Sequence, residues 1–310
     1  MFLSILNKKF AYSFILNNQT LKYANILLLK RQASSSSNLN SSLFNKIEQH
    51  FATKHPKVYS YYVMSVSGSK SCLSDTKIYF KLRKQILSKE RTFSDFSIPE
   101  LLIYLQTNEN IAKMVSLLFV SFVVPLGLPL VILTMIFRPQ LVLTRHFWTP
   151  QQTTSVQLNE LKKIQDVNFP CILQQLSEKN KNLSTQLPLK FYQLPSTTVN
   201  LSKLEELSSS QLYHLKRLHK VSPFSLGTKS LKERVLILQL LDRKMAEDME
   251  KELKGLDVNQ LKLHLYIRKL NYAKMDAESM QSLLNKWLQH CSTLPPSTYV
   301  YAPFLIQAKF

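Results

Sequence analysis

The longest apolar run in the chain limits its possible folds more than any other feature. Met114 to Phe137 is 24 residues long and contains no ionisable side chain, with Lys113 before it and Arg138 after it. A helix of this length extends about 36 Å, enough to cross about 30 Å of hydrocarbon with some tilt. We predict a single transmembrane helix over 112–137; the alternative is a buried helix of a large core.

Composition bounds the kind of partner. The 310 residues include 40 Lys plus Arg against 20 Asp plus Glu, a formal net charge of +20, which favours an anionic partner such as nucleic acid or anionic lipid. Four glycines and three cysteines form no nucleotide-binding loop and no CxxC motif. The histidines, acids and cysteines show no catalytic or metal-ligand spacing, so we expect no enzyme activity, cofactor or metal.

The first residues have the composition of a mitochondrial targeting sequence. Residues 1–47 contain lysines and one arginine but no acid before Glu48, and a Ser-rich stretch follows Arg31. We predict a presequence over 1–33.

Residues 34–111 are predicted to be a basic amphipathic helical region. Ile78, Leu82 and Ile86 share one side of a helix, and lysines and arginines surround them. Two interpretations stay open: attachment to anionic lipid, or a solvated basic face on a small packed subdomain.

The remainder, 138–310, reads as an all-helical domain. Capping-box motifs predict helix starts at Ser202 and Ser230 (S-x-x-E) and at Asp257 (D-x-x-Q). Asp276 can cap a further helix. From Leu231 to Leu253 apolar residues recur every three or four positions, with Gly255 as a predicted stop. The predicted fold class is therefore all-α.

One predicted helix has a basic face. In Leu201 to Lys220 the leucines share one arc, and the opposite arc is predicted to carry Tyr213 and three cations. We predict a ribosome- or RNA-binding surface, whereas the alternative is that these charges only complement the helix dipole. The candidate residues, including cations from later helices, are Tyr213, Lys216, Arg217, Lys220, Lys262, Arg268 and Lys269.

The segment behind the apolar run, FRPQLVLTRHFWTPQQ, combines cations and aromatic residues between two prolines. Such side chains are typical of a membrane interface. The predicted interface residues are Lys113, Arg138, Arg145, Phe147 and Trp148. The alternative is that Trp148 packs into the helical domain.

The chain also resembles a known family. The apolar run, the RHFWTP string and the stretch LKLHLYIRKLNYAKMDAESMQSLLNKWLQHC are similar to mitochondrial LETM proteins, and specifically to the shorter LETM domain-containing branch. The resemblance implies an inner-membrane protein with a matrix-facing, ribosome-binding-like domain. Where the family often has Arg-Gly, this chain has Arg268 followed by Lys269, which puts a tight turn of the relatives in question.

These features lead to two functional hypotheses. The first is an inner-membrane adaptor, single-pass with its C-terminal domain in the matrix, that binds the mitochondrial ribosome through rRNA or ribosomal proteins and supports respiratory-chain biogenesis and mitochondrial homeostasis. Inner-membrane lipids, respiratory-chain assembly factors and a second copy of the chain are its other candidate partners. The alternative is a component or regulator of cation/proton exchange. Because the apolar run offers only Ser116, Ser121 and Thr134 as polar groups, the sequence favours the adaptor.

Overall fold

The computed structural model describes residues 53–54, 56–123 and 143–308, with short gaps at 179, 182, 184–186, 197–198, 223–224 and 226, and the isolated positions 127, 130, 133 and 134. The chain divides into two compact units, 1–65 and 66–310, and the second contains the helical domain. The predicted presequence lies outside the described residues.

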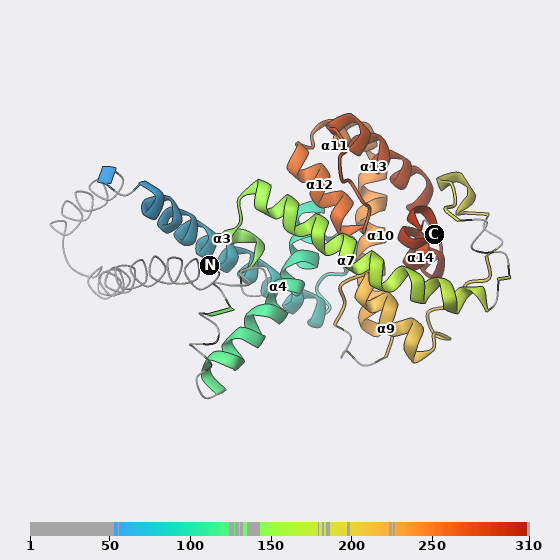
Figure 1. Ribbon diagram of the computed structural model, residues 1–310, viewed down its shortest axis with the longest axis horizontal. Helices are drawn as coiled ribbons and strands as arrows, with labels where there is room; N and C mark the ends of the chain where they lie inside the picture. The colour runs from blue at the N-terminus through green and yellow to red at the C-terminus, as the bar shows by residue number, and fades with distance from the viewer. Residues whose placement is uncertain are drawn as a thin grey trace, which may run out of the picture. The chain divides into compact units, whose positions relative to one another are not determined.

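Every regular element of the described part is a helix, which confirms the all-α prediction (Figure 1). The α-helices are α3 Pro56–Leu87, α4 Ile98–Val123, α7 Pro150–Ser177, α9 Ser209–Leu218, α10 Lys229–Glu247, α11 Met249–Lys254, α12 Val258–Ile267, α13 Ala277–Cys291 and α14 Pro296–Gln307. Three short 3-10 helices are η1 Phe93–Asp95, η2 Arg145–Phe147 and η3 Phe191–Gln193.

Helix α10 lies at the centre of the second unit. It packs against α4, α13 and α14, while α7 packs against α9 and α12 (Figure 1). Its leucines 231, 238 and 241 are completely buried, as the apolar periodicity predicts. The predicted stop at Gly255 ends the short α11, because the chain already breaks at Asp248, the residue that follows α10.

Two of the four predicted helix starts are confirmed. Asp257 accepts a hydrogen bond from the Gln260 backbone N–H at 2.8 Å, and Asp276 accepts one from Ser279 at the same distance. These acceptors satisfy backbone donors that the first turn of a helix leaves unpaired.

The other two boxes do not act as helix caps. The hydroxyl of Ser230 bonds the Ser225 hydroxyl at 2.6 Å, and Glu233 accepts a bond from the Tyr104 hydroxyl at 2.9 Å. Helix α10 therefore begins before this box, after Thr228. Similarly, residues 201–207 form no helix, and α9 is capped by Ser208.

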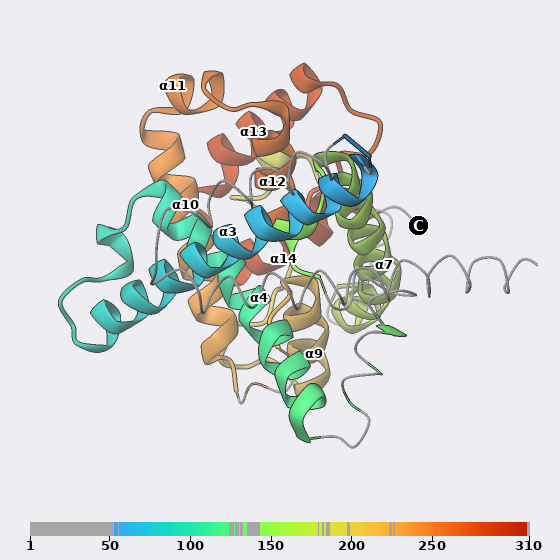
Figure 2. The ribbon, with the colours of Figure 1, turned by 90° about the vertical axis from the view of Figure 1, so that its left-hand side faces the viewer.

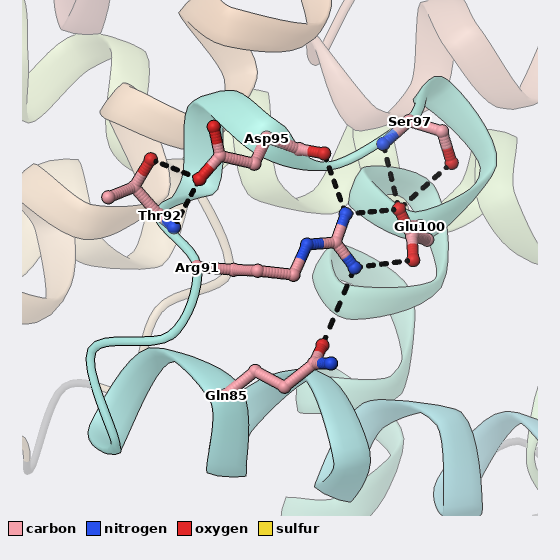
Figure 3. A network of polar contacts seen from close by, with 6 residues as sticks. All are labelled: Gln85, Arg91, Thr92, Asp95, Ser97 and Glu100. Atoms are coloured by element: carbon pink, nitrogen blue, oxygen red, sulfur yellow. Dashed lines mark hydrogen bonds and ion pairs between the residues drawn. The ribbon is translucent and has the colours of Figure 1, made fainter.

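A polar network fixes the turn between α3 and α4 (Figure 3). Arg91 donates to both oxygens of Glu100, at 3.1 and 3.2 Å, and also to the Asp95 carbonyl. The Ser97 backbone N–H adds a bond to Glu100 at 2.8 Å, and hydrogen bonding from Arg91 is the main reason that the pKa of Glu100 falls to about 2. The bidentate pair fixes the turn that follows α3 to the first turn of α4, and the two helices cross (Figure 2).

The predicted transmembrane helix is not found within the part of the chain that the structure describes. Helix α4 takes the first residues of the apolar run only as the end of a 26-residue helix, whose middle contains the polar residues Gln106, Asn108 and Glu109. None of the described helices combines the length and the apolar character that a membrane crossing needs. Most of the run beyond Val123, and Arg138 after it, lie outside the described residues.

Candidate functional site

A cleft of about 1230 Å³ lies among α3, α4, α7, α9, α10 and α12, and η2 also lines it. Its walls include many charged side chains, among them Lys220 and Lys262 from the predicted set. Concave sites with convergent polar groups are the usual binding sites of proteins, so we take this cleft as the candidate site.

Two of the predicted lysines occupy an unusual backbone position. Lys220 follows α9 with φ of 56° and Lys269 follows α12 with φ of 63°, so both are in the left-handed region. In each case the lysine N–H bonds three residues back, and the next N–H bonds five back, from Val221 to Lys216 and from Leu270 to Leu265. This is the Schellman termination of a helix, a position that usually holds glycine.

The second of these turns lies at Lys269. Lys269, at the position where the sequence resemblance had suggested a glycine, forms a tight left-handed turn. A left-handed conformation costs a residue with a Cβ about 1–2 kcal/mol. Both lysine side chains are thereby directed into the domain, where Lys269 is completely buried.

The Lys220 ammonium is the centre of a buried ion network. Its Nζ lies 2.9 Å from an oxygen of Glu109, 3.1 Å from both oxygens of Glu160, and donates to the Tyr266 hydroxyl at 2.6 Å. Tyr266 in turn donates to Glu160. Arg234 completes the network as an ion pair, 2.9 Å from the second oxygen of Glu109. The network therefore connects α4, α7 and α10 to the ends of α9 and α12.

Electrostatics keep this network ionised. Burial favours the neutral form of Glu109, but attraction from Lys220 and Arg234 outweighs it and lowers the pKa of Glu109 to about 2. For Lys220, burial opposes the charge, and Glu109 with its neighbours raises the pKa above its usual range. Paired charges of this kind tolerate burial, because each lost water contact is replaced by a partner.

Lys269 lies beside this network without joining it. Its Nζ sits 4.5 Å from the centre of the Tyr266 ring and has no hydrogen-bond partner among the described residues. Burial lowers the pKa of Lys269 to about 7, against the pull of Glu109 in the opposite direction. Near neutral pH this lysine therefore changes between the charged and the neutral form.

Arg268 belongs to a second buried cluster. It donates from Nε to Asp242 at 2.8 Å, and the other oxygen of Asp242 accepts bonds from Trp287 and Tyr299, both at 2.7 Å. Arg268 also donates to the His264 carbonyl at 2.7 Å. This cluster connects α10, α12, α13 and α14 and has a structural role, since all its donors and acceptors face one another.

The predicted basic face is therefore wrong in part. Lys216, which is 2% exposed, donates to the Ser225 carbonyl instead of facing solvent. Lys220, Arg268 and Lys269 also point into the domain. The cations of the set that remain accessible are Arg217, which is exposed, and Lys262, which is half-buried and 3.4 Å from the Thr154 hydroxyl. Periodicity of one helix could not show this. The residues after α9 accept the Lys216 hydrogen bond, and the left-handed turn after the helix reorients Lys220.

Tyr213 and Arg217 remain together on the outer side of α9. Tyr213 is 42% exposed, and the Arg217 guanidinium donates to its hydroxyl at 2.8 Å and lies 5.6 Å from its ring centre. Arg217 also lines the cleft with Lys262. The structure thus brings two of the predicted cations to one accessible site.

Three of the predicted membrane-interface residues, Arg145, Phe147 and Trp148, contact the protein itself. Arg145 pairs with Asp75 of α3 at 2.5 Å, and the Phe147 ring packs against Gly68, where no Cβ would fit. Trp148 is half-buried and lines the cleft. For Trp148, packing on the domain is the arrangement found, and Lys113 remains exposed.

Sequence reasoning missed two parts of this site. Helix α7 was not separately predicted, although Thr149 and Gln152 form a capping box at its start. Glu109 and Glu160 gave no local signal, because each acid acquires its role only when its helix meets Lys220.

Comparison with known proteins supports the family. No family model matches the chain, and no solved structure matches it. The chain is 25% identical over 272 residues to LETM1 domain-containing protein 1 of Xenopus tropicalis, a match that covers 81% of this chain and 77% of that protein. This similarity confirms the resemblance found in the sequence and supports membership of the LETM-domain family.

Proposed function

We propose that this protein is a mitochondrial adaptor of the LETM-domain family, whose helical domain binds the mitochondrial ribosome or a respiratory-chain assembly partner. The function is binding rather than catalysis. The similarity to a LETM1 domain-containing protein supports the family part of the proposal. The ribosome part rests on the surface of the domain.

The observation that carries the proposal is the accessible cation pair at the cleft. Arg217 and Lys262 line the same cleft, and the exposed ring of Tyr213 lies beside Arg217. Guanidinium and ammonium groups bind phosphates, and an exposed aromatic ring can stack on an unpaired base. The ion network beneath them, centred on Lys220, fixes the helices from which they extend.

A double substitution tests this proposal. We expect Arg217→Gln with Lys262→Gln to weaken co-sedimentation of the full chain with mitochondrial ribosomes. If each cation neutralises one phosphate, the slope of log affinity against log salt becomes flatter by about 1.5. The matched control is Lys274→Gln with Lys286→Gln, which removes the same charge from positions away from the cleft.

The possible outcomes separate charge from site. Loss of ribosome binding in the cleft variant alone supports the proposal. Equal losses in both variants would show that ribosome binding depends only on the net charge of the domain. Unchanged binding in both variants would exclude the cleft as the ribosome contact.

We also propose that the apolar run attaches the protein to the inner membrane, with the helical domain in the matrix. Val115, Phe119 and Val123, spaced four apart on α4, are 59–60% exposed, and exposed apolar side chains at such spacing fit a lipid or protein environment. Alkaline extraction of mitochondria tests the attachment: the chain should stay in the pellet. Protease treatment of mitoplasts should leave residues 150–310 intact. If the protease digests these residues while matrix marker proteins stay intact, the helical domain faces away from the matrix.

A further inference from the structure

The outward side of α3 carries an apolar stripe that the fold does not use. Leu73, Phe80 and Leu87 are seven residues apart and are 56%, 56% and 74% exposed. Seven residues are almost two helical turns, so the three side chains form one line about 21 Å long. A water-exposed line of large apolar groups commonly marks a contact surface.

The opposite side of the same helix already supplies the packing that α3 needs. Tyr79 and Leu82 are each 2% exposed, and Cys72 is 7% exposed. Tyr79 also accepts a bond from Arg83 and donates to Asn108 of α4. The apolar side recognised in the sequence therefore packs inward, and the stripe is a second apolar surface on α3.

A row of lysines runs beside the stripe. At 100° per residue the row lies within an arc of about 60°, next to the arc of the stripe. Each of these lysines is exposed, and none pairs with an acid among the described residues. The row consists of Lys70, Lys77, Lys81 and Lys84.

No carboxylate opposes this row on the outward side. Between Val66 and Leu87 the one acid is Asp75, and it pairs with Arg145 on the inward side. A second copy of the chain would bring lysines against lysines, which disfavours self-association through this face. RNA would use the lysines but leave most of the apolar stripe in water.

We propose that the outward face of α3, defined as these three apolar residues and four lysines, lies on the surface of an anionic lipid bilayer. The apolar stripe enters the boundary between headgroups and acyl chains, and the lysines reach lipid phosphates beside it. None of the seven residues of this surface lines the cleft that carries the proposed ribosome contact. None of them belongs to the apolar run after Lys113.

A fluorescent label on the stripe tests the proposal directly. The full chain carrying Phe80→Cys and Cys171→Ser is labelled, since the remaining Cys72 and Cys291 are buried, and is incorporated into liposomes. We expect a blue-shifted emission and quenching by spin-labelled lipid in vesicles that contain an anionic phospholipid. Neutral vesicles or high salt should abolish both signals. Because the label reports on position 80, insertion of another segment does not produce this result.

Charge-matched variants show whether the lysine row is responsible. Each lysine near an anionic surface contributes about fivefold to the partition coefficient, so replacing all four by Gln should lower the coefficient for insertion of the labelled face several-hundredfold. The control replaces four lysines elsewhere, Lys162, Lys163, Lys274 and Lys286, by Gln and should keep the signal. Helix content and Trp287 fluorescence verify that every variant is folded.

Three results would overturn the proposal. One is a label that behaves alike in neutral and anionic vesicles. Another is an equal loss of signal in the two sets of lysine variants. The third is a blue shift without lipid that grows with protein concentration, which would identify the stripe as a contact between copies. A failure of ribosome binding, in contrast, leaves the label result unchanged.

Discussion

Replacing Lys269 by Met should alter how the stability of the domain depends on pH. The lysine side chain is completely buried, its ammonium lies 4.5 Å from the centre of the Tyr266 ring, and burial lowers its pKa to about 7. In the unfolded chain the same group has a pKa of about 10.4. Met fills a similar volume and carries no charge, so the substitution removes the titration while keeping most of the packing.

The sign and size of the effect come from linkage. Above pH 7 the folded protein loses the Lys269 proton while the unfolded chain still binds it, so the free energy of unfolding of the wild type rises with pH. Between pH 7 and 8.5 this rise integrates to roughly 1.5 kcal/mol. The advantage of the Met variant over the wild type should therefore be larger at pH 7 than at pH 8.5, by about that amount.

Urea unfolding of the full chain, followed by tryptophan fluorescence, to which the buried Trp287 contributes, measures this difference. Taking the difference between the two proteins cancels other groups, including Cys291, whose thiol has a pKa raised by burial. The control is Lys163→Met on the exposed side of α7, which should give a flat difference. A flat difference for Lys269→Met as well, or a variant less stable than the wild type at pH 7, would refute the reasoning.

Three further substitutions or conditions test the interior. Arg268→Met, which leaves its buried carboxylate partner without a cation, should lower the free energy of unfolding by about 3–5 kcal/mol in urea. Gly68→Ala places a Cβ 2.6 Å from the His146 carbonyl oxygen, so it should destabilise by about 1–3 kcal/mol and lower the midpoint of thermal unfolding. Burial lowers the pKa of both His219 and His264 to about 3. The unfolded chain therefore binds protons at these histidines before the folded protein does, so the free energy of unfolding should fall as the pH drops from 6.5 toward 3. His219→Gln should make this fall less steep when acid unfolding is followed by fluorescence.

The sequence by itself determined the helices whose signals are local. The apolar spacing from Leu231 to Met245 lies in one helix as predicted, and the caps at Asp257 and Asp276 are confirmed. These signals depend on groups three or four residues apart, which meet whenever the segment is helical. Composition and the resemblance to the LETM family likewise needed no structure.

Tertiary structure decided which of the predicted capping boxes caps a helix. The Glu205 side chain pairs with Lys232, and the Glu233 side chain accepts a bond from Tyr104 of α4, so neither carboxylate closes a capping box. A short motif occurs in several places along a chain, and the partner that lies nearby in space selects among them.

Tertiary structure also decided where the cations go. Helical periodicity places Lys216, Arg217 and Lys220 on one face, but α9 ends before Lys220, and a left-handed residue redirects its side chain toward Glu109 and Glu160. The acids that neutralise it come from helices distant in the sequence. Burial of a charge is favourable only when such partners converge, and this convergence, unlike helix formation, is a property of the packed domain and not of any segment.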